Sequence, residues 1–496
     1  MNPNKILFDY SKTLFPSFAI IKGENTHQGR GGGPSGGGAS TGISLEGLHG
    51  TVALPPPAAS PWRQYLAFAG PALLVSVGYM DPGNWATDLQ AGAEFKYSLL
   101  WVVGLSSLMA VILQVIAARL GVATGKDLAQ CCRDFLPSWT RWPNYLSCEV
   151  AIAACDLAEV LGSAVALHLL FPRLSLLAAV VITSFDVVIL LSLQRFGMRP
   201  IEAVVLVLIS TVALCYYAEL FVIPQTRPDL PELARGLFAP GLRDFLGSSA
   251  MVYVAIGIIG ATVMPHNLYL HSALVQTRKL SPDPDSVRRA TLYNTLDTSV
   301  ALAGAFLVNA AILVLAAVIF YGHDQVTLAS GRTIAFSPDS DWIQVAYATL
   351  APLVGKIAAS ILFAVALLAS GQSSTITGTL AGQVVMEGFM NWTIPPWLRR
   401  LVTRLCAIVP AVLFVALKGG GSVTDLLTLS QVVLAVQLPL AMVPLLWFAG
   451  SSRRMGEGRI GGPLLAAGWS CCVLITALDV YGLPGAIHDV ARVFSR

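Results

Sequence analysis

Apolar runs long enough to cross a bilayer of about 30 Å recur along most of this chain, which restricts it to a membrane protein. The composition agrees, since 55% of the 496 residues are hydrophobic and 12% are charged, against about 25% charged in soluble domains. We predict an all-α polytopic membrane protein with eleven spans, near residues 65–91, 97–119, 144–168, 174–193, 201–223, 248–276, 297–320, 342–380, 401–417, 423–448 and 463–483.

The placement of Lys and Arg predicts the orientation of these spans. If the N-terminus is cytoplasmic, about two thirds of the 31 Lys and Arg residues fall on the cytoplasmic side, where such an excess is expected. An odd number of spans then places the C-terminus outside. The net charge of +3 follows from this bias and does not indicate nucleic-acid binding. No organelle signal is evident, so in a bacterium we expect the inner (cell) membrane.

Two of the predicted spans are interrupted in the same way. The first contains GYMDPGNWATD (78–88) and the sixth contains ATVMPHN (261–267), so each is an apolar half-helix, a break with Pro and Asn, and a second half-helix. Matching interruptions in the two halves of a transporter indicate an inverted repeat with the binding site at its interface. We therefore predict five-span repeats at about 62–223 and 246–448, with an additional helix at 463–483.

The ends of the chain differ from this transmembrane domain, which we place at 61–484. Residues 1–60 include the low-complexity stretches GRGGGPSGGGASTG and ALPPPAASP, which cannot bury a core and predict a disordered cytoplasmic tail. Residues 485–496 are expected to be a short C-terminal tail. The eight cysteines lie mostly in or beside apolar spans and are expected to be small buried residues, without a disulfide framework or a zinc cluster.

The prolines identify the groups that each break exposes. A proline lacks the N–H that would bond the carbonyl four residues earlier, which frees the carbonyls of Gly78 and Ala261. The residue before each proline is forced out of helical geometry, and these residues are Asp81 and Met264. Asn84 adds an amide oxygen. A buried methionine or a kink is usually a packing feature, whereas an ionisable side chain at this depth is functional by default.

The chemistry of this set favours a transition metal. Several hard oxygens with one negative charge and one thioether suit Mn²⁺, Fe²⁺, Co²⁺ or Cd²⁺ better than Mg²⁺ or Ca²⁺, which prefer oxygen alone. Gln431 and Gln437 in the tenth span are further oxygen donors that could complete a metal shell. The chain has no H-E-x-x-H, G-x-S-x-G or Walker motif, which argues against a metalloprotease, a lipase and an ATP-driven pump.

Three carboxylates of the third span lie on one helical face. Glu149, Asp156 and Glu159 are spaced seven and three residues apart. A charged stripe in an apolar helix cannot face lipid, so it either lines a polar path or packs against cations. We interpret it as a proton route, with a structural network of arginines as the alternative.

Other titratable and basic groups could join this route. His266 and His271 follow the second break and titrate near neutral pH, so they are candidate relays. Arg399, Arg400 and Arg404 open the ninth span. Arg400 and Arg404 are candidate counter-charges, and Arg399 is better explained as a positively charged anchor at the cytoplasmic surface.

The motifs together resemble the Nramp family of proton-coupled divalent metal transporters, whose bacterial members are called MntH. The resemblance covers about residues 62–483 and rests on DPGN, DLAEVLG, ATVMPHN, GQSSTITGTLAGQVVMEGF and SQVVLAVQLPLAMVPL. It implies a LeuT-type fold, alternating access, and symport of divalent metal ions with protons into the cytoplasm. Mn²⁺ and Fe²⁺ are equal candidates for the cargo. We expect no resident cofactor and a monomer in the lipid bilayer.

Carried over residue by residue, the resemblance implies a metal site and a proton route. Gln431 rather than Gln437 matches the glutamine that joins the family's metal site in the occluded state. The implied metal groups are Asp81, Asn84, Met264, Gln431 and the carbonyls of Gly78 and Ala261, and the implied proton-route groups are Glu149, Asp156, Glu159 and His266. Gly78 stands where alanine is common in bacterial members. Relatives that carry Mg²⁺ or Al³⁺ lack the methionine found at Met264.

Two other classes of protein compete with this interpretation. A LeuT-type sodium/amino-acid symporter also has broken first and sixth helices, but Asp81 in its site would repel the substrate carboxylate. A metal-gated receptor or channel could be built on the same scaffold. Saturable uptake driven by a pH gradient separates a carrier from such a channel.

Overall fold

The computed structural model describes residues 49–183, 198–218, 228–281, 283–323, 325–327, 333–335, 342–343, 345–346, 357–392 and 423–495, and the single positions 394, 398, 402, 405, 409 and 412. All of them belong to one unit, Thr41–Arg496. Some predicted features lie outside the described residues, namely residues 1–48, the second half of the fourth span, most of the ninth span, and Arg399, Arg400 and Arg404.

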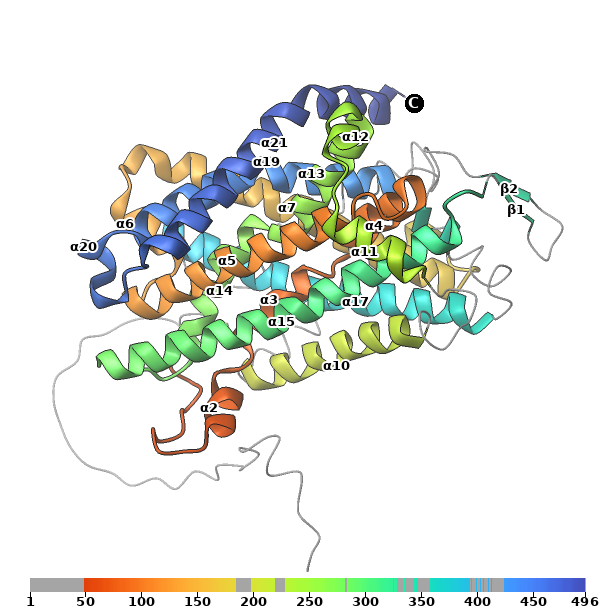
Figure 1. Cartoon of the computed structure of the whole chain (residues 1–496). Helices are drawn as coiled ribbons and strands as arrows, with labels where there is room; N and C mark the ends of the chain where they lie inside the picture. The colour runs from red at the N-terminus through yellow and green to blue at the C-terminus, as the bar shows by residue number, and fades with distance from the viewer. Residues whose placement is uncertain are drawn as a thin grey trace, which may run out of the picture. The chain divides into compact units, whose positions relative to one another are not determined.

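The described elements are almost all helical (Figure 1). The first half of the chain contains α2 (Pro61–Phe68), α3 (Pro71–Gly78), α4 (Pro82–Phe95), α5 (Leu100–Thr124), α6 (Leu128–Phe135), η2 (Ser138–Thr140), α7 (Arg141–Leu170), α8 (Leu176–Thr183), α10 (Met198–Tyr217), α11 (Leu230–Phe238) and α12 (Leu242–Gly247). The second half contains α13 (Ser249–Val263), α14 (Pro265–Leu274), η5 (Val275–Thr277), α15 (Pro284–Ile319), α17 (Ile357–Met390), α19 (Val423–Ala449), α20 (Ser452–Met455), η7 (Gly456–Gly458) and α21 (Gly462–Ser495). Strands β1 (Gln325–Thr327) and β2 (Thr333–Ala335) pair antiparallel, with Val326 opposite Ile334.

Within the described part of the chain, eight helical segments are long and apolar enough to cross a membrane. They are Leu100–Thr124, Ser138–Leu170, Met198–Tyr216, Ser249–Thr277, Pro284–Ile319, Ser360–Met390, Leu426–Ala449 and Gly462–Gly482. The prediction of an all-α polytopic membrane protein is therefore confirmed. The first predicted span is not among the eight, because the break divides it into two short helices.

Two predicted span boundaries are wrong, each for a physical reason. The first span was placed from residue 65, but Gly70, with a φ of 133°, separates α2 from α3, which begins at Pro71. The eighth was placed at 342–380, whereas α17 continues to Met390 because its polar residues are buried against other helices. The last predicted span, 463–483, agrees with the apolar segment Gly462–Gly482, and α21 continues beyond it to Ser495 because backbone hydrogen bonds do not require apolar side chains.

The two interrupted helices have the predicted local geometry. Asp81, before Pro82, has extended backbone and caps α4 by accepting a hydrogen bond from the backbone N–H of Asn84. Met264, before Pro265, separates α13 from α14 with a φ of 34° and a ψ of 105°. Helix α4 packs against α13, α15 and α19, so both breaks lie inside the helix bundle.

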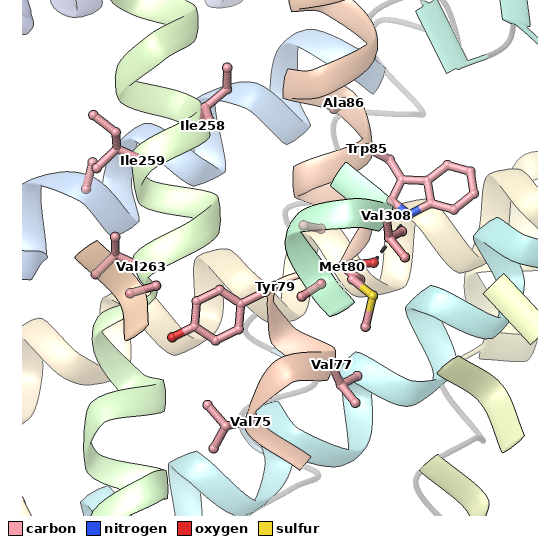
Figure 2. Close-up of a cluster of buried hydrophobic side chains, with 14 of the residues drawn as sticks. Val75, Val77, Tyr79, Met80, Trp85, Ala86, Ile258, Ile259, Val263 and Val308 are labelled. Carbon is pink, nitrogen blue, oxygen red and sulfur yellow. Dashed lines mark hydrogen bonds between the residues drawn. The ribbon is translucent and has the colours of Figure 1, made fainter. Parts of the chain in front are cut away.

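Buried apolar side chains surround the breaks. Figure 2 shows Val75, Val77, Tyr79 and Met80 around the end of α3, with Val263 at the end of α13. The indole N–H of Trp85 donates to the carbonyl of Met80 at 3.3 Å and ties the turn to α4. This packing holds the interrupted backbone in one arrangement despite its missing helical hydrogen bonds.

The segment before α2 contacts the loop that follows α14. The N–H of Val52 donates to the carbonyl of Thr277 at 3.0 Å, and the N–H of Lys279 donates to the carbonyl of Val52 at 2.9 Å. Val52 and Arg278 form an isolated parallel bridge. Within the predicted tail, the backbone groups of Gly50 and Val52 therefore have partners that a sequence pattern does not reveal, and disorder of residues 1–48 stays a prediction.

Candidate functional site

Oxygen atoms from both breaks converge on one nitrogen. The Nδ2 atom of Asn84 donates to Asp81 Oδ1 at 2.7 Å, to the carbonyl of Ala261 at 3.1 Å and to the carbonyl of Gly78 at 3.3 Å. The two carbonyls are the ones that the proline positions select, and they come from helices far apart in the sequence. The structure thus brings four of the predicted metal-site residues to one point between the half-helices.

Met264 lies beside the same point. A Cβ atom built on Gly78 would lie 3.1 Å from Met264 Sδ, which places the sulfur next to the last residue of α3. The side chain is fully buried and packs with Ala151, Cys155 and Leu434. A φ of 34° is unusual for a bulky residue and costs about 1–3 kcal/mol, so it persists only where the surroundings enforce it.

Gln431 reaches this region and Gln437 does not. A Cβ atom on Gly83 would collide with the side-chain amide of Gln431, so that amide lies against the first turn of α4. Gln437, six residues further along α19, directs its Nε2 at Ser147 Oγ and Cys148 Sγ of α7, each at 3.5 Å. Of the two candidate glutamines, the structure brings only Gln431 to the breaks.

Several buried acceptors around the breaks have no hydrogen-bond donor among the described residues. They are Asp81 Oδ2, Asn267 Oδ1, Asn309 Oδ1 and Gln431 Oε1. A buried acceptor left unpaired costs about 1–3 kcal/mol. Two of the four, Asp81 Oδ2 and Gln431 Oε1, belong to predicted metal-site residues, and a bound cation would satisfy both of them. Each of these four residues is at most 1% exposed, so the site is closed to solvent in this structure.

Two polar residues near the breaks were missed by the sequence analysis. Asn309 of α15 donates from Nδ2 to the carbonyl of Tyr79 at 2.7 Å and to Asn84 Oδ1 at 3.2 Å. Asp88 is 1% exposed and lies seven residues after Asp81, on the same face of α4. The sequence signal for both residues is a polar side chain inside an apolar run. Such a pattern shows that the residue is unusual, but it does not show which residue it contacts.

The carboxylates of α7 face α17. Glu159 Oε1 accepts a hydrogen bond from Ser374 Oγ at 2.7 Å. A Cβ atom on Gly378 would lie 3.0 Å from Glu159 Oε1 and 3.4 Å from Asp156 Oδ1, so both carboxylates lie against the same glycine. Asp156 and Glu159 are buried, whereas Glu149, about two turns earlier, is partly exposed. Arg400 and Arg404 lie outside the described residues, so their pairing with these acids stays a prediction.

The two histidines of α14 have different surroundings. His266 directly follows Pro265, and its buried Nδ1 has no hydrogen-bond partner within the described residues. His271 Nδ1 lies 3.0 Å from Gln114 Oε1, and Gln114 Nε2 donates to the hydroxyl of Tyr79 at 2.7 Å. His271 is therefore linked through α5 to the residue that follows Gly78, while His266 lies next to the second break.

Helix α3 is anchored at its start by charged residues that the sequence analysis did not assign. Asp297 Oδ2 accepts from the N–H groups of Gly70 and Ala72, at 3.3 and 3.0 Å. The Arg278 guanidinium pairs with Glu202 at 2.9 Å and donates to the carbonyl of Ala69 at 2.5 Å. The first half of the broken helix is thus held by α10, α15 and the loop after α14.

Comparisons with known proteins agree on one family. The family model described as "Natural resistance-associated macrophage protein-like", or Nramp, matches residues 72–484. The chain is 47% identical to the divalent metal cation transporter MntH of a Nostoc species over 438 residues, covering 88% of this chain and 95% of that protein. It is 50% identical to MntH 1 of Pseudomonas aeruginosa over 428 residues, covering 86% and 93%.

Solved structures are similar over most of the chain. Crystal structures of the Eremococcus coleocola manganese transporter superpose with a TM-score of 0.78 at 36% identity, covering 91% of this chain and 97% of that one. The nucleobase–cation symporter Mhp1 superposes with a TM-score of 0.54 at 15% identity, covering 86% and 92%. The latter likeness concerns the fold alone, and it confirms the predicted LeuT-type architecture.

Proposed function

The chain belongs to the Nramp family, and we propose that it is a secondary active transporter that imports divalent transition-metal ions together with protons. The observation that carries the proposal is the convergence of the Asp81 carboxylate and the Gly78 and Ala261 carbonyls on the Asn84 amide, beside the sulfur of Met264. Family membership makes the protein a transporter and not an enzyme. Metal ions are then its cargo, and we propose no resident cofactor.

We propose that the metal-site residues are Asp81, Asn84, Met264, Gln431, Gly78 and Ala261. Asp81 supplies the negative charge, and the other oxygens supply neutral dipoles. The Asn84 amide now directs its partly positive NH₂ group at the three oxygens, in the place that a cation would take. Rotation of the terminal amide torsion, which is soft, presents Oδ1 to the metal instead. Gln431 Oε1, unpaired among the described residues, is the additional acceptor from α19.

The composition of the site supports selectivity for transition metals. Neutral oxygens with one carboxylate would bind Ca²⁺ and Mg²⁺ as well, but the thioether of Met264 is a ligand that these two ions do not favour. Mn²⁺, Fe²⁺ and Co²⁺ accept mixed ligands, and Cd²⁺ favours sulfur more strongly. We therefore propose Mn²⁺ and Fe²⁺ as physiological cargo, with Co²⁺ and Cd²⁺ also carried.

The proton route that we propose follows α7. Cys155 packs against Met264, and its thiol donates to Glu159 Oε1 at 3.6 Å. The acidic face of α7 therefore lies next to the metal site. Asp156, Glu159 and His266 are the proposed proton carriers near the metal, and Glu149 continues the route along the helix. Arg400 and Arg404 are the proposed counter-charges.

The proposal also includes the membrane location, the orientation and the oligomeric state of the protein. We propose a location in the bacterial inner membrane, a cytoplasmic N-terminus, an outside C-terminus and a monomeric working unit. The proton gradient then supplies the energy for uptake. A sodium/amino-acid symporter is disfavoured, because Asp81, buried in the site, would repel a substrate carboxylate.

The test is uptake of Mn²⁺ by the purified protein in proteoliposomes, with and without an inward proton gradient. We expect saturable uptake that the gradient accelerates and that Cd²⁺ inhibits, while Ca²⁺, Mg²⁺ and alanine do not compete. Accumulation of alanine driven by sodium, or Mn²⁺ uptake that does not saturate and ignores the gradient, would contradict the proposal.

A further inference from the structure

Asn267 makes a direct contact with the sulfur of Met264. It lies three residues later on α14, is fully buried, and donates from Nδ2 to Met264 Sδ at 3.4 Å. Its backbone N–H donates to the carbonyl of Met264 at 3.2 Å. Both groups of Asn267 therefore fix the residue that separates the two half-helices.

Gly78 shares this packing. A Cβ atom at position 78 would collide with Asn267 Nδ2 and lie 3.1 Å from Met264 Sδ. The amide of Asn267 thus fills the space that a larger residue 78 would occupy. The sulfur, the amide and the α-carbon of Gly78 form one contact group on the inner side of the first break.

The sulfur needs such a contact to stay in one position. Methionine has three rotatable bonds and adapts easily to gaps. The apolar neighbours of Met264, which are Ala151, Cys155 and Leu434, restrict its volume but give the sulfur no direction. Among the described residues, the side-chain N–H of Asn267 is the hydrogen-bond donor to this sulfur. A thioether has two lone pairs, so one can accept this bond while the other faces a cation.

We propose that Asn267 is a positioning residue that determines the metal specificity of the site by holding the Met264 sulfur toward the cation. The inference rests on the proposed metal transport. Its consequence differs between metals, because the sulfur contributes strongly to binding of Cd²⁺ and little to binding of the harder Mn²⁺. Gly78 contributes to the same positioning, because the Cβ atom of an alanine at this position would displace the side-chain amide of Asn267.

The experiment compares Cd²⁺ and Mn²⁺ affinities of the wild type and Asn267→Leu, measured by calorimetry on the full-length protein and by uptake in proteoliposomes. Leucine has a similar shape and no N–H donor. A lost hydrogen bond of ordinary strength predicts a Cd²⁺ Kd that rises about three- to ten-fold. The Mn²⁺ Kd is expected to change less than about two-fold, because the variant removes none of the oxygens of the proposed metal-site residues.

Two controls separate positioning from a general structural effect. In a Met264→Ala background, Asn267→Leu should leave the ratio of Cd²⁺ to Mn²⁺ affinity unchanged, since the residue acts through the sulfur. Asn294→Leu removes another buried amide, about four turns before Asn309 on α15, and should not change the ratio. Asn267→Ser, which is smaller and has a shorter reach, provides a second variant if leucine prevents folding.

The outcomes are distinguishable. A folded Asn267→Leu or Asn267→Ser protein that transports Mn²⁺ and keeps the wild-type ratio overturns the inference. An equal change of the ratio in the Met264→Ala background also overturns it, because the effect then does not pass through the sulfur. Failure of the wild type itself to carry Mn²⁺ contradicts the proposed function instead.

Discussion

The ion pair between Glu202 and Arg278 is expected to stabilise the start of the broken first helix. The two side chains are 6% and 1% exposed and their charged atoms are 2.9 Å apart. Arg278 also donates to the carbonyl of Ala69, directly before α3. Replacing Glu202 with glutamine keeps the shape of the side chain and leaves the buried guanidinium without its closest anion.

The expected magnitude follows from this burial. Removal of one partner from a buried pair costs about 3–5 kcal/mol. Asp297 also interacts electrostatically with Arg278, so in the Glu202→Gln variant it still compensates part of the charge of Arg278. We therefore expect a cost just below this range, about 2–3 kcal/mol, because some negative charge remains nearby. If opening of α3 breaks this pair, its amides should exchange about 30- to 150-fold faster.

The assay is hydrogen–deuterium exchange with mass spectrometry of the peptide that covers residues 66–78. The matched control is Glu232→Gln, which removes the partner of Lys96 in a pair whose side chains are 41% and 33% exposed. Such a surface pair contributes about 0–1 kcal/mol, so exchange in α3 should not change. A folded Glu202→Gln protein with wild-type exchange in α3 would refute the anchoring role.

Three further substitutions test other parts of the site. Asp156→Asn should reduce proton movement in a pH-sensitive dye assay while calorimetric Mn²⁺ affinity persists, and an affinity loss as large as that of Asp81→Asn would place α7 in the metal shell. Met264→Ala should keep measurable Mn²⁺ uptake, bind Cd²⁺ more weakly and allow Ca²⁺ or Mg²⁺ to compete. If this variant still excludes Ca²⁺ as strictly as the wild type, Met264 is a packing residue and not a selectivity residue. Gly83→Ala should displace the side chain of Gln431 and weaken Mn²⁺ binding several-fold, and unchanged affinity would remove Gln431 from the site.

The breaks were predictable because proline acts locally. A missing N–H and a steric clash with the preceding residue identify freed carbonyls and non-helical residues without any knowledge of the fold. The periodicity of α7 likewise placed Asp156 and Glu159 on one face. For these features, the information is contained within a few neighbouring residues.

The contacts between helices were not predictable in the same way. Periodicity indicates that a side chain points inward but does not say which residue of another helix lies opposite. Asn309 and Asn267 act on atoms of the breaks only because α15 and α14 pack there. The pairing of Glu202 with Arg278 joins positions 76 residues apart. The bridge of Val52 to the loop after α14 depends on backbone groups, which carry no side-chain signal.

Metal binding at the proposed site depends most directly on Asp81. It is the one charged residue among the proposed metal ligands, so Asp81→Asn leaves a divalent cation largely uncompensated in a poorly hydrated site. The decisive measurement is Mn²⁺ uptake into proteoliposomes by folded Asp81→Asn protein under an inward proton gradient, with the partly exposed Asp134→Asn as the matched carboxylate control. We predict uptake at the background level for Asp81→Asn and wild-type uptake for Asp134→Asn. Normal Mn²⁺ uptake by the Asp81→Asn protein would contradict the assignment of the metal site.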